Sequence, residues 1–161
     1  MRVLGIDPGT ATTGIAIVEE KSGNLNAIYY SCIKTLSNIP ISYRLDKIFK
    51  NINSIILEFS PDCLAVEELF FSDNVKTALS VGQATGVILL TASQNNLEVY
   101  KYTPLQVKKA VVGFGNASKK QVQYMVKAIL KIKDEKIEDD AADALATAIC
   151  HLNWKRNKRI F

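Results

Sequence analysis

Histidine and cysteine are scarce in this chain, and their scarcity narrows the chemistry that it can perform. The 161 residues include one histidine and three cysteines. Because the single histidine, His151, lies near the C-terminal end, a Ser/His/Asp catalytic arrangement has little support, and we expect His151 at the surface or at an interface. The cysteines (Cys32, Cys63 and Cys150) lie among apolar residues without zinc-ligand spacing, so we expect them to be reduced and buried.

Long apolar runs are also missing. Residues 87–90 form one of the longest, far short of the roughly 20 residues that a membrane-spanning helix needs. The sequence opens with a strand-like segment rather than with a basic stretch, an apolar stretch and a cleavage site. We therefore expect a soluble, cytoplasmic protein without a secretion signal.

What is present suits one folded unit. With 48% hydrophobic residues and no repeat or linker-like stretch, the chain is expected to form a single domain over residues 1–154, followed by a basic tail at 155–161. The net charge of +4 is compatible with a polyanionic partner but is also common in proteins that bind none. Basic patches around an acidic pocket would suit a nuclease, since phosphates dock on cations and metal ions bind carboxylates.

Apolar periodicity and turn residues predict an α/β domain with a central mixed five-stranded sheet flanked by helices. The expected strands are 2–7, 14–18, 27–33, 63–67 and 97–102. The expected helices are 42–59, 75–92, 104–112, 119–132 and 139–154. Ala78, Gly82 and Gly86 recur every four positions in the second helix, which allows close approach to a sheet or to a second subunit. Of these two explanations we favour packing in the core.

Two acidic residues stand where two predicted strands end. Asp7 ends the first strand, and Glu67 ends an almost wholly apolar strand. In open α/β sheets the carboxyl ends of strands face the ligand crevice, so each is a candidate metal ligand. Asp7 alone is equally well explained by a hydrogen bond to its own turn. Since side chains alternate along a strand, only one of Glu67 and Glu68 can share the side of Asp7, and we choose Glu67 because it directly follows the apolar run.

A third acidic group opens the last predicted helix. Asp140 and Asp143 are three residues apart, so both can point toward one ion. Acids in a first helical turn are also favoured by capping and by the helix dipole. The neighbouring Asp139 leaves open which of the two adjacent acids faces the metal. Small residues allow the helix to lie close to a sheet: Ala141, Ala142, Ala144 and Ala146.

This set of carboxylates suits a two-metal phosphodiesterase. Two divalent cations about 3.5–4 Å apart stabilise the attacking and the leaving oxygen of an in-line phosphoryl displacement. Carboxylate ligands select Mg²⁺ or Mn²⁺ over softer ions, and we expect two Mg²⁺ ions per site, with Mn²⁺ as a substitute. The predicted catalytic residues and metal ligands are Asp7, Glu67, Asp140 and Asp143.

Six short segments carry motifs that occur together in one known family. They are residues 5–10, 65–67 with Phe70, 82–86, 106–108, 111–115 and 140–146. In this order and at these separations they resemble the bacterial RuvC crossover junction endonucleases, and the resemblance covers essentially the whole chain. It implies a ribonuclease-H-like fold, a homodimer, and Mg²⁺-dependent cutting of two strands of like polarity in four-way (Holliday) junctions during recombination and repair. It also implies the RuvA-RuvB branch-migration complex as a partner.

The resemblance also suggests residues that contact DNA. Phe70 matches an aromatic residue that stacks on unpaired bases, which is reasonable because every base offers a π-face. Core packing is the competing explanation for Phe70 and Phe71, although two phenylalanines before a polar loop are oddly placed for it. Lys108 and Lys119 match basic residues near the scissile phosphate, and Lys120 adds a charge beside them.

Three other functions stay open at this level. The first strand and its turn also resemble the phosphate loop of actin-like ATPases and sugar kinases, but those enzymes close two such domains around a nucleotide and this chain has room for one. A related nuclease that acts on RNA is the second alternative. A module that binds branched DNA without cutting it is the third, and the complete acidic set argues against it.

Overall fold

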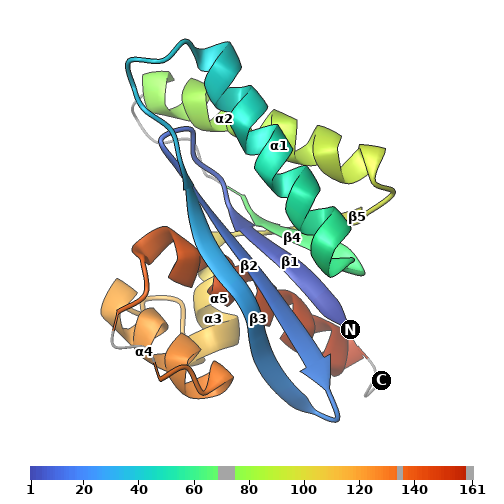
Figure 1. The fold of residues 1–161 in the computed structure, drawn as a ribbon. Helices are drawn as coiled ribbons and strands as arrows, with labels where there is room; N and C mark the ends of the chain where they lie inside the picture. The colour runs from blue at the N-terminus through green and yellow to red at the C-terminus, as the bar shows by residue number, and fades with distance from the viewer. Residues whose placement is uncertain (69–74, 134–135, 159–161) are drawn as a thin grey trace.

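A five-stranded sheet lies between two layers of helices (Figure 1). The structure, a computed structural model, describes residues 1–68, 75–133 and 136–158. Its strands are β1 (Arg2–Asp7), β2 (Thr12–Lys21), β3 (Asn24–Lys34), β4 (Cys63–Glu67) and β5 (Glu98–Tyr102). Its helices are α1 (Ile41–Phe59), α2 (Val75–Gln94), α3 (Pro104–Val112), α4 (Lys119–Leu130) and α5 (Asp139–Lys158). The predicted α/β class and the mixed five-stranded sheet are confirmed.

The strand order β3-β2-β1-β4-β5 puts β1 in the middle of the sheet. β1 runs antiparallel to β2 and parallel to β4, and β4 runs parallel to β5. Parallel neighbours need a crossover connection, and α1 and α2 supply the two crossovers. As a result, the carboxyl ends of β1 and β4 lie side by side at one edge of the sheet.

Alternation along the central strands divides the interior into two cores. Leu4 and Ile6 of β1 point to one face, where they pack with Leu64 of β4 against α1 and α2. Val3 of β1 and Cys63 of β4 point to the other face, which is covered by α3, α4 and α5. Figure 1 shows α1 and α2 on one side of the sheet and α3, α4 and α5 on the other. Every second residue of β1 and β4 therefore faces α5.

Helix α5 lies directly on the sheet because glycines stand beneath it. A Cβ atom on Gly5 of β1 would clash with the carbonyl oxygen of Ala144, and a Cβ atom on Gly14 of β2 would clash with that of Asp140. Both clashes are with backbone, so no side-chain rotation could relieve them. These contacts fix the first turns of α5 over the ends of β1 and β2.

The glycines of α2 have a different role from the one that we expected. A Cβ atom on Gly82 or Gly86 would meet nothing within 4 Å, and both residues are exposed. Among the described residues of α2, Ala84, Ile88 and Ala92 pack in the core and are fully buried. The expectation that the glycines pack in the core is therefore wrong, and they form part of an open helix face.

His151 is also placed differently from our expectation of a surface or interface residue. It belongs to α5, and its side chain is fully buried between this helix and the sheet. The ring Nδ1 lies 2.7 Å from the hydroxyl oxygen of Tyr102, and Nε2 lies 3.3 Å from the Sγ of Cys63. Burial lowers the pKa of His151 to about 4, so the ring is neutral at pH 7. Because both ring nitrogens have partners inside the protein, the imidazole can be buried without losing hydrogen bonds.

The cysteines and several element ends differ in part from expectation. All three cysteines are free; Cys63 and Cys150 are buried, whereas Cys32 is only half-buried. β2 and β3 extend beyond their predicted ends, because the outer part of this hairpin is polar and carries no apolar alternation. α5 continues through Lys158, four residues past its predicted end. Among the described helices, none is both long and apolar enough to span a bilayer.

Candidate active site

Four carboxylates from three elements gather on the face of the sheet that α5 covers. Asp7 and Glu67 end β1 and β4, and the neighbouring pair Ile6 and Val66 are partners across these parallel strands. The alternation that turns Val3 and Cys63 toward α5 also turns Asp7 and Glu67 toward it. Asp140 and Asp143 occupy the first turns of α5.

Gly14 explains how the acids of α5 come close to Asp7. Gly14 is the cross-strand partner of Asp7, and it is also the residue on which the backbone of Asp140 rests. The glycine therefore brings the start of α5 to the end of β1. Without a side chain at this position, two acids that are 133 residues apart in the sequence can share one site.

Burial and mutual repulsion raise the pKa values of these acids. Burial, followed by the charges of Glu67, Asp143 and Asp140, raises the pKa of Asp7 to about 8. Burial and the charge of Asp143 raise the pKa of Glu67 to about 7, against the opposing effect of Lys108 and Lys119. Burial also raises the pKa of Asp143. Such a group of partly buried carboxylates is unfavourable unless cations balance it.

Two lysines face the acids from α3 and α4. Together with Glu67 and Asp143, Lys108 and Lys119 line a cleft of about 200 Å³. The Nζ of Lys119 lies 3.2 Å from Oδ2 of Asp143. Burial acts to lower the pKa of Lys119, but the charges of Asp143 and Asp139 outweigh it and raise the pKa, so the side chain is cationic at pH 7.

Local sequence signals fix the helices that carry these lysines. α3 begins with a capping box in which Thr103 and Gln106 bond reciprocally to each other's backbone N–H groups. α4 begins with the same arrangement between Ser118 and Gln121. Lys119 is consequently the first residue of α4, at the mouth of the cleft.

The donor set fits divalent cations such as Mg²⁺, although the side chains do not close on one point. Among the described residues, no three acidic, histidine or cysteine side chains lie close enough together to hold a single ion as they stand. Glu67 and Asp143 line the cleft, whereas Asp140 lines a separate hollow of about 510 Å³ beside Thr10 and Ser80. Asp7 interacts electrostatically with all three of the other acids. Hard carboxylate oxygens are the ligands that Mg²⁺ prefers, and this partly buried site supplies four carboxylates.

The adjacent acids separate into different environments. Asp139 is exposed; its Oδ1 accepts a hydrogen bond of 2.8 Å from Gln123, and its Oδ2 lies 3.4 Å from Nζ of Lys119. The negative charge of Asp140 is among the causes that raise the pKa of Asp7. Glu68 is exposed and follows the end of β4. The placement therefore favours Asp140 over Asp139, and Glu67 over Glu68, as ligands.

The predicted DNA-binding residues are only partly described. Phe70 and Phe71 lie outside the described residues, so their predicted stacking on bases stays a prediction. Lys108 and Lys119 both line the cleft, and their predicted place near the scissile phosphate stays a prediction. Lys120 lies on α4 next to Lys119 but lines a different hollow.

This sheet order, with acids supplied by β1, β4 and the helix laid across them, defines the class of ribonuclease-H-like nuclease domains. Within that class, the family model of the crossover junction endodeoxyribonuclease RuvC matches residues 3–151. The chain belongs to this family, and the resemblance seen in its motifs is confirmed.

Individual relatives are similar to this chain over nearly the full length of both sequences. The chain is 49% identical to the crossover junction endodeoxyribonuclease RuvC of Desulforamulus reducens, over 96% of this chain and 94% of the relative. It is 52% identical to that of Caldicellulosiruptor saccharolyticus, over 94% of this chain and 92% of the relative. The solved structure of Thermus thermophilus RuvC in complex with a Holliday junction substrate superposes with a TM-score of 0.93 at 35% identity, covering 98% and 96% of the two chains.

Proposed function

We propose that this protein is a structure-specific endonuclease that resolves four-way DNA junctions by hydrolysing one phosphodiester bond in each of two strands of like polarity. The observation that carries the proposal is the joint placement of four acids and two lysines at one end of the sheet. Family membership supports the junction as the substrate, since a relative with the same fold is described in complex with one. The activity belongs to homologous recombination and DNA repair.

The residues divide into two roles. Asp7, Glu67, Asp140 and Asp143 hold the divalent cations, for which we propose two Mg²⁺ ions, with Mn²⁺ as a substitute. When bound, such ions stabilise the charge on the attacking and leaving oxygens of the phosphodiester. Lys108 and Lys119 bind the phosphate beside the cut, because both line the same cleft as Glu67 and Asp143 and carry the positive charge that a phosphate needs. Val107 and Val122 contribute apolar side chains to the lining of the cleft.

Two symmetric cuts call for two sites related by a twofold axis, so we propose a homodimer. The open face of α2 supports it: Leu79 and Leu90 are 65% and 55% exposed, and Gly82 and Gly86 between them allow another backbone to approach closely. We further propose that the RuvA-RuvB branch-migration complex presents the junction to the dimer and that the activity takes place in the cytoplasm, where the chromosomal substrate is.

Cleavage assays test the central proposal. The protein is incubated with a four-way junction, a linear duplex of the same sequence and a structured RNA, each with Mg²⁺ or with EDTA. We expect paired nicks confined to the junction, in Mg²⁺ only. Cleavage of RNA alone would assign the other nuclease function, and binding without any cleavage in Mg²⁺ or Mn²⁺ would reduce the protein to a binding module.

The dimer is tested separately. Gly86→Glu places a charged side chain on the open face of α2. We expect sedimentation analysis to show a dimer for the wild-type protein and a monomer for the variant, which should lose paired cutting. A wild-type monomer that still makes paired cuts would contradict the proposal.

A further inference from the structure

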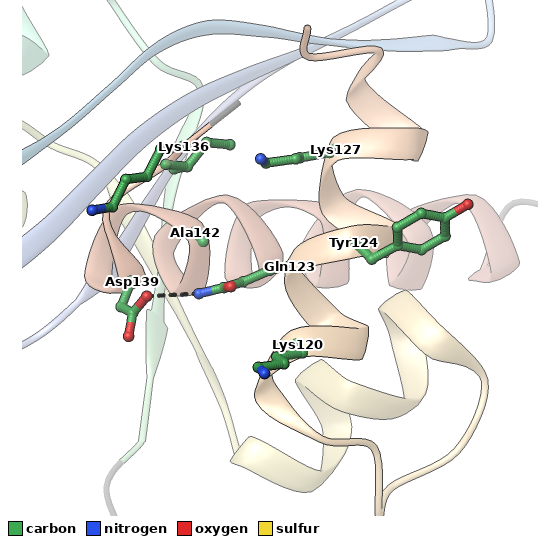
Figure 2. A pocket seen from close by; sticks show the side chains of 8 residues that line it. Lys120, Gln123, Tyr124, Lys127, Lys136, Asp139 and Ala142 are labelled. Atoms are coloured by element: carbon green, nitrogen blue, oxygen red, sulfur yellow. Dashed lines mark hydrogen bonds between the residues drawn. The ribbon is translucent and has the colours of Figure 1, made fainter. Parts of the chain in front are cut away.

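A hollow distinct from the active-site cleft lies between α4 and the start of α5 (Figure 2). Its volume is about 360 Å³. The polar residues that line it include Lys120, Gln123 and Lys127 of α4, Lys136, and Asp139 of α5. In Figure 2, Lys120, Gln123 and Lys127 extend from α4 toward the side on which Asp139 lies.

The hollow is cationic. Lys120, Lys127 and Lys136 contribute three positive charges, against one negative charge from Asp139. The carboxylate of Asp139 already has partners: it accepts a hydrogen bond of 2.8 Å from Gln123 (dashed in Figure 2) and forms an ion pair with Lys119 at 3.4 Å. Because lysines outnumber acidic residues in the lining, an anion is the favoured occupant.

The spacing of the lysines matches a repeating anion. Lys120 and Lys127 are seven residues apart, which places them on one face of α4 with a separation of about 10 Å along its axis. A single DNA strand presents one phosphate for about every 3.4 Å of its helix axis, so this distance corresponds to about three nucleotides. One small anion would not use both lysines, whereas a nucleic-acid backbone would.

The hollow adjoins the cleft across α4. Lys119 and Val122 of α4 line the cleft, and the next residues in each case, Lys120 and Gln123, line the hollow. Asp139 joins the two, because it lies in the wall of the hollow and contacts Lys119. A strand that leaves the cleft across the start of α4 therefore reaches the hollow directly.

We propose that this hollow binds the sugar–phosphate backbone of a junction arm beside the cut, with Lys127 and Lys136, together with Lys120, as phosphate-binding residues outside the catalytic site. The proposal rests on the proposed function, since it adds a contact to the same substrate. It requires no metal ion, so binding in the presence of EDTA tests it independently of cleavage.

The test compares two double variants that remove the same charge. Lys127→Ala with Lys136→Ala removes two lysines from the hollow. Lys47→Ala with Lys50→Ala removes two exposed lysines from α1, on the opposite face of the sheet. Both are measured by fluorescence anisotropy with a labelled four-way junction in EDTA over a series of salt concentrations, and the folding of each is checked by its urea midpoint.

We expect the hollow variant to bind the junction about tenfold more weakly at low salt, as for two exposed ion pairs. Its salt slope should fall by about 1.8, or 0.9 for each phosphate that a lysine no longer neutralises. Ethylation of phosphates near the cleavage point should interfere with wild-type binding, and in the hollow variant that interference should disappear at one group of phosphates outside the cut. The α1 variant should behave as wild type.

Equal weakening by both double variants would overturn the proposal, since net charge alone would then explain it. An unchanged ethylation pattern in the hollow variant would overturn it as well. If the wild-type protein binds junctions but cuts none, the proposed function fails while the binding comparison still decides this inference. If the wild-type protein cuts junctions and the hollow variant binds like wild type, only this inference fails.

Discussion

Replacing Asp7 by asparagine should stabilise the metal-free protein while removing its activity. Asp7 is surrounded by three other acids, and its pKa rises from 3.8 to about 8. At roughly 1.4 kcal/mol for each pKa unit between 3.8 and 7, the carboxylate destabilises the folded state at pH 7 by about 4 kcal/mol. An asparagine amide also loses hydration on burial, at a cost of about 1–3 kcal/mol. Asp7→Asn should therefore raise the free energy of unfolding at pH 7 by about 1–3 kcal/mol.

The difference in stability between the variant and the wild-type protein should depend on pH. Because the folded pKa is raised, the unfolded chain releases the Asp7 proton first as pH rises, so the wild-type protein loses stability between about pH 4 and pH 8. Near pH 4 the electrostatic penalty is almost absent, so the variant should be less stable than wild type by the amide cost of about 1–3 kcal/mol. Its advantage should be largest at pH 8. Mg²⁺ should offset most or all of the variant's advantage, since an ion at 100 times its dissociation constant stabilises the wild-type protein by about 2.7 kcal/mol.

Urea denaturation at several pH values, in EDTA and in Mg²⁺, measures all of these effects. Asp46→Asn is the matched control, because Asp46 is an exposed carboxylate on α1 whose pairing with Lys50 should contribute less than about 1 kcal/mol. The Asp7 variant should cleave no junction but should bind it as tightly as wild type. A variant that is less stable than wild type at pH 8 in EDTA would refute the electrostatic reasoning.

Four further outcomes are expected. Gly14→Ala should destabilise the protein by about 1–3 kcal/mol, because the added methyl group displaces the backbone of Asp140, and it should abolish cleavage; a wild-type urea midpoint would contradict this. Asp140→Asn should abolish cleavage whereas Asp139→Asn should keep most of it, and the reverse result in a nuclease assay would exchange their roles. Lys119→Ala should weaken junction binding and reduce its salt slope by about 0.9, so an unchanged slope would argue against a phosphate contact. The pKa of His151 is lowered from 6.5 to about 4, so the unfolded chain takes up the proton first as pH falls, and the protein should lose about 3 kcal/mol of stability between these two values. In urea titrations, His151→Leu should flatten that part of the profile of stability against pH. A variant profile identical to that of wild type would be evidence against this role of His151.

The sheet and most helices could be predicted because their signals are local. The apolar run of β4 and the helical spacing in α1 each lie within one segment, and the capping residues Ser118 and Gln121 mark the start of α4. The outer part of the β2–β3 hairpin was underestimated because its residues are polar and extend beyond the core. Periodicity detects burial, so it misses strand that is not buried.

The candidate acids could be found for a similar reason, since they stand at the ends of recognisable elements. The choice between Asp139 and Asp140 could not be made, because both lie in one helical turn and only the sheet beneath α5 distinguishes them. His151 was misjudged because its partners, Tyr102 and Cys63, are 49 and 88 residues away in the sequence. The apolar residues Ile149 and Leu152, which lie close to His151 in the sequence and are fully buried, were the signal that could have indicated its burial.

The glycines beneath α5 restrict how the sequence of such a protein can evolve. A ligand carboxylate can be replaced and later restored in a single step, and a surface lysine can move along its helix. Gly5 and Gly14 have no such freedom, because each touches backbone that is present whatever the facing residue is. Related sequences should therefore drift widely over α1 and the hairpin tip while these two positions stay invariant, which makes the pair a sharper marker for distant members than any single acid.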